Sequence, residues 1–344
     1  MGQLCDEYLD RTERGLIITR RRTTKKASTL YTDRGRVVRH IKPLLGHRTV
    51  KDLTVGDVRK FLRDVISGKT KANVKTKKRG RAIVKGGPGT GSRTLGLLGG
   101  IFSYAVEEGY RADNPVKGIV RPSDQRREFR LDPKGYRALG QILESDHAAV
   151  ESWQAREAIR LIALTGCRRG EVEKLRRSEI DLAGQALRLG DTKTGRSVRP
   201  IGQVVARALA DITSGSSDDY VFPSTRIDGA PFQGLPRALR RLVASKIPGL
   251  TAHGLRHSFA SVAEDLGYTL PTIGALLGHA GNGMTASYIH KLDQVLIAAA
   301  DRISEHIASM MAGTTSNVIS LPKRKRARSS SRVERSRLAT NRRG

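Results

Sequence analysis

The stretch HGLRHSFASVAEDLGYTLPTIGALLGHAGNGMTASY, residues 253–288, combines helix-like apolar positions with an arginine, histidines and a tyrosine. His253 and Arg256 are three residues apart, so a helix places both side chains on one face. His279 follows Leu-Gly, and Tyr288 comes nine residues later. Arginine offers a rigid fork of donors that fits phosphate oxygens, histidine can transfer a proton near neutral pH, and tyrosine is a nucleophile once activated. The stretch therefore predicts an anion site in a helical region.

The whole chain is strongly basic. Lys and Arg number 63 against 33 Asp and Glu, for a net charge of +30 over 344 residues. Residues 323–344 hold ten Lys/Arg and one acidic residue, so most of the surplus lies in the body of the chain. A surplus of this size predicts a polyanionic partner. The sequence contains no apolar run of 18 residues and no signal-peptide pattern, and its two cysteines cannot cross-link so long a chain. We expect a soluble intracellular protein that binds nucleic acid.

The length and the apolar pattern predict two domains. Residues 1–118 are expected to form a helical domain, and residues 119–130 a polar linker. Residues 131–312 are expected to form a second, mostly helical domain, in which residues 185–202 alternate as a β-hairpin. Residues 313–344 have the composition of a basic, disordered tail.

Local signals place two helices in the first domain. Apolar residues over 30–45 recur at helical spacing, and Gly46 is placed to end that helix. Thr54 precedes a second apolar stripe, and either it or Asp57 is expected to cap that helix.

A glycine-rich segment next in the chain is a near-match to a phosphate-binding loop. The glycines that bound residues 86–91 have the right gap, but Ser-Arg at 92–93 stands where that loop needs Lys and Ser/Thr. We therefore favour a flexible basic turn over residues 67–85, followed by a helix over about 92–108.

The segment TGCRRGE, residues 165–171, is a second candidate anion site. A helix that ends at Gly166, an arginine in the turn, and a new helix at Glu171 would aim donors at an anion. Arg168 is the expected donor, whereas Arg169 is expected to be an ordinary surface residue.

The spacing of two histidines, His253 and His257, raises the question of a metal site. His253 and His257 have a spacing that zinc can use, but Gly254 stands where a zinc-protease helix needs glutamate. We expect no metal here, and we expect His257 to be structural or solvated.

Five motifs in one order resemble the tyrosine recombinases, the family of phage and mobile-element integrases. They are TGCRRGE (165–171), DTKTG (191–195), HGLRH (253–257), LGH (277–279) and SY (287–288). Each motif is weak alone, but their order and spacing together are specific. The resemblance covers nearly the whole chain. It implies a mainly α fold with a small antiparallel β-sheet, in which a helical core-DNA-binding domain and a catalytic domain close as a C-shaped clamp around DNA.

The resemblance implies a nucleophile and its proton acceptor. Tyr288 would attack the scissile phosphate, form a 3′-phosphotyrosine and free a 5′-hydroxyl. His253 would help move the tyrosine proton. General chemistry agrees, because free tyrosine has a pKa of about 10 and needs such help at neutral pH.

The remaining matches surround the phosphate. Arg168 and Arg256 would hold its non-bridging oxygens, and His279 would support it. Lys193 would protonate the leaving 5′-oxygen, although a lysine on a hairpin turn is by itself usually only solvated. Glu171 would brace the arginine turn. Two fixed guanidinium groups stabilise the charge that develops on the phosphate, so no metal and no cofactor is implied.

The implied partners are double-stranded DNA and a homo-tetramer on synapsed DNA, with DNA-bending accessory proteins as further candidates and no membrane. The implied function is site-specific integration or excision of a mobile element, in the cytoplasm beside the nucleoid of a prokaryotic or phage-infected cell. Two alternatives stay open: a type IB topoisomerase-like enzyme that relaxes DNA, and a non-catalytic DNA-binding protein on the same scaffold. The basic stretch 69–85 lies outside the family's common pattern.

Overall fold

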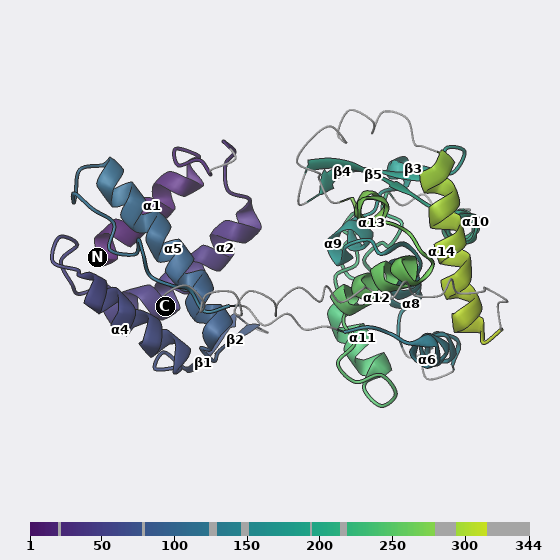
Figure 1. Ribbon diagram of the computed structural model, residues 1–344, viewed down its shortest axis with the longest axis horizontal. Coiled ribbons are helices and arrows are strands. Elements are labelled where there is room, and N and C mark those ends of the chain that lie inside the picture. Colours follow the sequence, from purple (N-terminus) through teal and green to yellow (C-terminus); the bar gives the residue numbers. More distant parts are fainter. Residues whose placement is uncertain are drawn as a thin grey trace, which may run out of the picture. The chain divides into compact units, whose positions relative to one another are not determined.

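The structure, a computed structural model, describes residues 1–19, 22–77, 80–123, 129–145, 151–192, 195–213, 219–278 and 294–314. The chain divides into two compact units, Met1–Arg127 and Glu128–Gly344, each with its own hydrophobic core (Figure 1). Both are helical with small antiparallel sheets, which confirms the predicted fold class. The domain limits at 118 and 131 stay predictions, and the expected tail lies outside the described residues from 315 onward.

The first unit is a helical bundle with one hairpin. Its helices are α1 (Gly2–Glu13), α2 (Ala27–Arg36), the π-helix η1 (Val37–Ile41), α3 (Lys42–Leu45), α4 (Val55–Ile66) and α5 (Pro88–Glu107). The run from α2 to α3 is continuous and ends before Gly46, as predicted. A capping box starts α4: the Thr54 hydroxyl accepts from the Asp57 backbone N–H (3.2 Å), and the Asp57 carboxylate accepts from the Thr54 N–H (3.0 Å).

The prediction of a flexible turn over residues 67–85 is wrong. Strand β1 (Ala72–Lys77) pairs antiparallel with β2 (Gly80–Val84) as a two-stranded sheet. The β-branched residues Val74, Thr76, Ile83 and Val84 favour extended backbone, and this signal was hidden by the many Lys and Arg residues around them. The following helix α5 also begins earlier than predicted, at Pro88.

The second unit wraps helices around a buried helix and a small sheet. Its helices are α6 (Pro133–Glu144), α8 (Trp153–Thr165), α9 (Arg169–Glu173), the 3-10 turn η2 (Arg177–Glu179), α10 (Gln203–Thr213), α11 (Leu235–Val243), α12 (Ala252–Asp265), α13 (Leu270–Leu277) and α14 (Gln294–Ala312). Helix α14 packs against α6, α8 and α10. No described helix has both the length and the apolar character that a membrane span needs.

Helix α8 forms the centre of this unit, because its apolar residues after Trp153 are buried and α10, α11, α12 and α14 pack on it. It ends at Gly166, which adopts a left-handed conformation (φ 63°). A Cβ at this position would come within 2.7 Å of Leu277 and 2.8 Å of Phe259. Glycine is therefore required where the end of α8 meets α12 and α13.

The hairpin predicted over residues 185–202 is present. Strands β3 (Ile180–Asp181), β4 (Ala186–Thr192) and β5 (Gly195–Pro200) form an antiparallel sheet in the order β3-β4-β5. One detail differs from the sequence pattern: Arg199, rather than its neighbour Val198, points into the core. It is paired with Leu187 across the ladder and is only 1% exposed.

Candidate active site

In the turn between α8 and α9, both the backbone and the side chain of Arg168 are held by Glu171. The Glu171 carboxylate accepts from the Arg168 backbone N–H (2.8 Å) and from its Nη1 (2.6 Å). Glu171 is buried, whereas the Arg168 side chain keeps 24% of its surface exposed. The side chain of Arg168 is therefore fixed in direction and still accessible to a ligand.

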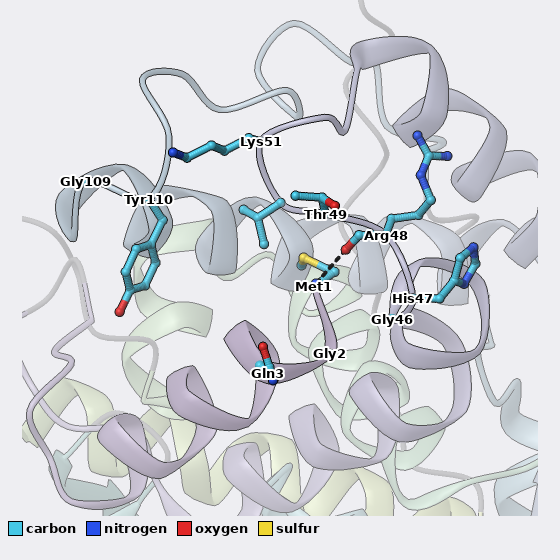
Figure 2. A pocket seen from close by; sticks show the side chains of 11 residues that line it. Met1, Gly2, Gln3, Gly46, His47, Arg48, Thr49, Lys51, Gly109 and Tyr110 are labelled. Carbon is cyan, nitrogen blue, oxygen red and sulfur yellow. Dashed lines mark hydrogen bonds between the residues drawn. The ribbon is translucent and has the colours of Figure 1, made fainter.

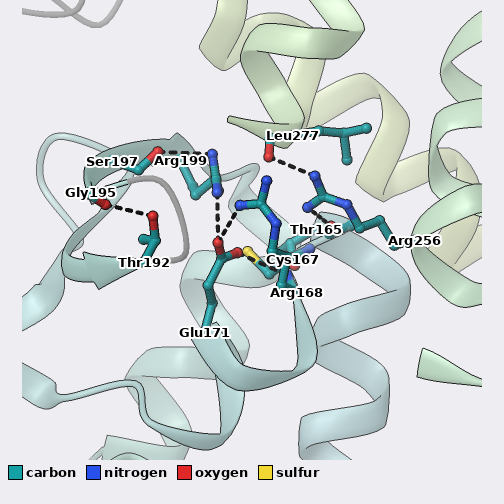
Figure 3. A network of polar contacts seen from close by, with 11 residues as sticks. Thr165, Cys167, Arg168, Glu171, Thr192, Gly195, Ser197, Arg199, Arg256 and Leu277 are labelled. Atoms are coloured by element: carbon teal, nitrogen blue, oxygen red, sulfur yellow. Dashed lines mark hydrogen bonds and ion pairs between the residues drawn. The ribbon is translucent and has the colours of Figure 1, made fainter. Parts of the chain in front are cut away.

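Arg256 comes from the second turn of α12, whose start is capped by Thr251. It is 6% exposed and donates to two main-chain carbonyls, those of Gly166 (2.7 Å) and Leu277 (3.0 Å). These bonds tie α12 to the end of α8 and to the end of α13 (Figure 3). Burial, followed by the nearby charges of Arg168 and Arg199, lowers the pKa of Arg256 to about 10.

Arg199 is the third arginine of the cluster, and sequence reasoning missed it. Its Nη2 donates to Glu171 Oε1 (2.9 Å) and its Nη1 to Ser197 Oγ (3.0 Å). Its Nε is buried without a hydrogen-bond partner among the described residues. The only available signal was a charged residue opposite Leu187, a core position of the neighbouring strand.

Arg199 also explains why residue 278 is a glycine. Gly278 ends α13 in a left-handed conformation (φ 59°), and a Cβ there would overlap the Arg199 guanidinium. The guanidinium therefore lies close against the main chain one residue before position 279. One buried side chain thus joins the hairpin, the arginine turn and the LGH motif.

The cluster carries a surplus of positive charge. Figure 3 shows the guanidinium groups of Arg168, Arg199 and Arg256 gathered near the single carboxylate of Glu171. Burial opposes ionisation of Glu171, but Arg199 and then Arg168 outweigh it and hold the pKa of the carboxyl below its usual value. Among the described side chains of this partly buried cluster, one carboxylate stands against three guanidinium groups, so positive charge predominates. Such a site favours an added anion, because charges attract more strongly away from bulk water.

His253 lies one turn before Arg256 on α12, and it contacts a second histidine. The Nε2 atoms of His253 and His257 are 3.0 Å apart, and the two rings meet edge to face. In such a pair one ring donates and the other accepts, so His257 influences which nitrogen of His253 carries its proton. The sequence had suggested only a structural or solvated role for His257.

Three predicted site residues, Lys193, His279 and Tyr288, lie outside the described residues. Lys193 is in the segment that connects Thr192 to Gly195, across which the Thr192 hydroxyl donates to the Gly195 carbonyl (2.5 Å). His279 is the next residue after Gly278. In the chain, Lys193 directly follows strand β4, which pairs with the strand that bears Arg199, and His279 directly follows Gly278, which Arg199 contacts.

Other candidate sites do not involve the predicted residues. No three His, Cys, Asp or Glu side chains gather as a metal site in the described part of the chain. A cavity of about 550 Å³ lies in the first unit between the start of α1 and residues 46–51, where the Met1 ammonium donates to the Arg48 carbonyl (Figure 2). None of the predicted catalytic residues lines it.

Replacing Gly278 by alanine tests the contact with Arg199. We expect Gly278→Ala to lower the free energy of unfolding by about 3 kcal/mol or more, of which the left-handed backbone accounts for about 1–2 kcal/mol and the collision for the rest. In an Arg199→Ala background the cost should fall to the backbone part. Urea unfolding of the two single variants and the double variant measures this coupling.

Gly249→Ala is the matched control, because Gly249 also has a positive φ (85°) and nothing lies within 4 Å of a Cβ there. Gly249→Ala should lower the free energy of unfolding only by the contribution of the left-handed backbone, about 1–2 kcal/mol. Strict additivity of Gly278→Ala and Arg199→Ala would show that the collision is not the cause.

Comparison with known proteins agrees with the fold and identifies the family. The family model described as "Phage integrase family" matches residues 130–295. Tyrosine recombinase XerD of Brucella abortus is 30% identical over 244 residues, 64% of this chain and 76% of that protein. Prophage integrase IntF of Escherichia coli is 26% identical over 138 residues, 39% of this chain and only 30% of that protein.

Among solved structures, a lambda integrase(75–356) dimer bound to a COC′ core site has a TM-score of 0.61 at 19% identity, covering 81% of this chain and 94% of that one. A lambda integrase tetramer bound to a Holliday junction has a TM-score of 0.58 at 21% identity, covering 80% and 77%. The chain belongs to the phage integrase family of tyrosine recombinases, enzymes of site-specific DNA recombination.

Proposed function

We propose that this recombinase cleaves and rejoins DNA through a 3′-phosphotyrosine on Tyr288, and that it integrates or excises a mobile element. The observation that carries the proposal is the arginine cluster, in which Arg168 and Arg199 bind the Glu171 carboxylate and Arg256 binds the adjoining Gly166 carbonyl. A phosphodiester supplies the missing negative charge. Fixed guanidinium groups then stabilise the additional charge that develops on its oxygens during attack.

The proposed cleavage step uses only groups of the protein and of the DNA. The Tyr288 oxygen forms a bond to phosphorus, the bond from phosphorus to the 5′-oxygen breaks, and DNA is left attached through its 3′-phosphate. His253 takes the tyrosine proton, and Lys193 gives a proton to the 5′-oxygen. Arg168 and Arg256 bind the non-bridging oxygens, with His279 beside them. Because the phosphotyrosine keeps the energy of the broken bond, the reverse attack by a 5′-hydroxyl rejoins the strand.

Glu171 and Arg199 support this chemistry indirectly. Glu171 aligns Arg168, and Arg199 holds Glu171 on its other side, so neither needs to contact DNA. Arg256 has its Nη atoms engaged by the carbonyls of Gly166 and Leu277, which fixes the plane of its guanidinium. Donors that are already fixed do not need to reorganise when the phosphate arrives.

The proposed partners are double-stranded DNA and three further copies of the chain on synapsed DNA. The lambda integrase structures, which contain a dimer on a core site and a tetramer on a Holliday junction, support this assembly by fold alone. We place the reaction in the cytoplasm of a prokaryotic cell, in line with the bacterial relatives. DNA-bending accessory proteins are part of the proposal only for the complete recombination reaction.

The test is a covalent-complex assay with a chelator present. Duplex DNA carrying the element's junction, with a nick just 3′ of the cleavage position, loses a short fragment on cleavage and so traps the intermediate. We expect a protein–DNA band on a denaturing gel in EDTA, and a phosphorylated Tyr288 peptide by mass spectrometry after nuclease digestion. DNA binding without a covalent band would support the binding-protein alternative, and relaxation of supercoiled plasmid without strand exchange would support the topoisomerase alternative.

A further inference from the structure

The β1–β2 hairpin is a separate basic structure in the first unit, and the family motifs do not account for it. Between residues 69 and 85 the chain has eight Lys or Arg and no acidic residue. Within the described residues only Lys69 has an acidic partner, Asp64. The two strands pack chiefly on each other, so the hairpin projects from the helices instead of covering them.

The two faces of the hairpin differ in chemistry. Residues that are paired across an antiparallel ladder share a face, and the faces alternate along each strand. The pairs Ala72–Val84 and Val74–Ala82 make one face small and apolar. The opposite face, which we call the basic face, consists of Asn73, Lys75, Arg81 and Ile83.

The basic face places like charges directly opposite each other. Lys75 and Arg81 are ladder partners, and both are exposed. A like-charge pair at this spacing destabilises a hairpin, and a two-stranded hairpin alone is already marginal in water. Arg81 is also held in direction, since its Nε donates to Asn73 Oδ1 (2.6 Å). An anion that lies over this face would remove the repulsion.

The root of the hairpin is held by two glycines. A Cβ on Gly86 would lie 2.5 Å from the Val65 carbonyl oxygen and 2.7 Å from Gly68 Cα. A Cβ on Gly68 would lie 2.8 Å from the Lys85 carbonyl oxygen. The Gly87 N–H donates to the Ile66 carbonyl (3.0 Å). This close backbone approach ties the hairpin to the end of α4 and the start of α5, so it is held at a defined position on the unit.

We propose that strands β1 and β2, residues 72–77 and 80–84, lie in the major groove of duplex DNA with their basic face toward the bases. This rests on the proposed function, since it takes DNA as the substrate. A two-stranded ribbon fits the major groove, which is about 12 Å wide, but not the minor groove of about 6 Å. The basic face carries the side-chain types that read base edges there: Arg and Lys for guanine, Asn for adenine, and an apolar group for the thymine methyl. Ile83 is 60% exposed on the same face as the two cations, so most of its apolar surface is open to a ligand.

The test compares the full chain with a Lys75→Ala/Arg81→Ala variant on a 40-base-pair duplex of random sequence. We expect the variant to bind about 10- to 100-fold more weakly at moderate salt, because two side chains that contact base edges are removed. A duplex with glucosylated 5-hydroxymethylcytosine, whose sugars fill the major groove, should weaken the wild type more than the variant. The variant should unfold at the same or a higher temperature, because a like-charge pair is removed.

Lys51→Ala/Lys117→Ala is the charge-matched control, since both lysines are exposed on the same unit outside the hairpin. An equal loss in both variants would overturn the proposal, and so would an equal effect of glucosylation on wild type and variant. Loss of binding to anionic phospholipid vesicles, with DNA binding intact, would assign the basic face to a membrane instead. The covalent-complex assay tests the proposed function separately. If the wild type forms the covalent band and the Lys75→Ala/Arg81→Ala variant binds DNA normally, the proposed role of the hairpin is refuted while the proposed function stands.

Discussion

Tyr288→Phe is expected to abolish the covalent protein–DNA complex while leaving DNA binding within about twofold of wild type. Phenylalanine has the same ring without the oxygen that attacks phosphorus, so no bond to DNA can form. Loss of a nucleophile costs at least about 10⁴-fold in rate in enzymes that depend on covalent catalysis. The measurement pairs a denaturing gel for the covalent complex with a mobility shift for binding, on the same nicked junction DNA.

Tyr268→Phe is the control, because this half-buried tyrosine packs against the core of the same unit. It should keep the covalent band at full intensity. A covalent band that persists in Tyr288→Phe, and that maps to another tyrosine, would show that the nucleophile is assigned to the wrong residue.

Arg256→Lys is expected to slow single-turnover cleavage by about 10²- to 10³-fold, the usual effect of removing one fixed donor to a developing oxyanion. Lysine keeps the charge, but a single ammonium cannot bond to the carbonyls of Gly166 and Leu277 and also present a planar pair of donors to phosphate. One buried carbonyl then loses its partner, which lowers the free energy of unfolding by about 1–3 kcal/mol. Equilibrium DNA affinity should change little, because most contacts lie elsewhere.

Arg169→Lys makes the same change at the neighbouring turn, where the side chain is 52% exposed and pairs only with Glu173. We expect its cleavage rate to stay within about threefold of wild type. Cleavage by Arg256→Lys at the wild-type rate, measured with enzyme in excess so that binding is saturated, would remove Arg256 from the phosphate site.

Local rules predicted several elements well. The capping of α4 by Thr54 and Asp57, the end of α3 before Gly46, and the hairpin over residues 185–202 all depend on residues that lie close in the chain. The family resemblance implied that Glu171 would brace the arginine turn, and Glu171 accepts from Arg168 across only three residues. The hairpin over residues 72–84 escaped prediction, because its few β-branched residues are outnumbered by lysines whose solvated side chains permit almost any backbone.

Local sequence rules could not predict contacts between segments that are distant in the chain. Nothing near Arg199 in the chain indicates that it is buried on Glu171 and against Gly278, because its partners are 28 and 79 residues away. The same holds for Arg256, whose carbonyl acceptors belong to the ends of two other helices. A buried arginine is tolerated only when tertiary packing delivers an acceptor for it, and periodicity contains no information about that acceptor.

The sequence by itself determined the family, the helices and the set of residues suited to phosphate chemistry, because short motifs and local backbone preferences carry that information. The tertiary structure alone decided that Arg168 and Arg199 share the Glu171 carboxylate beside Arg256, so that the described side chains of the cluster have a surplus of positive charge. That surplus arises only when α8, β5, α12 and α13 come together, since the attraction between buried charges depends on distance and on exclusion of water, neither of which a linear sequence contains.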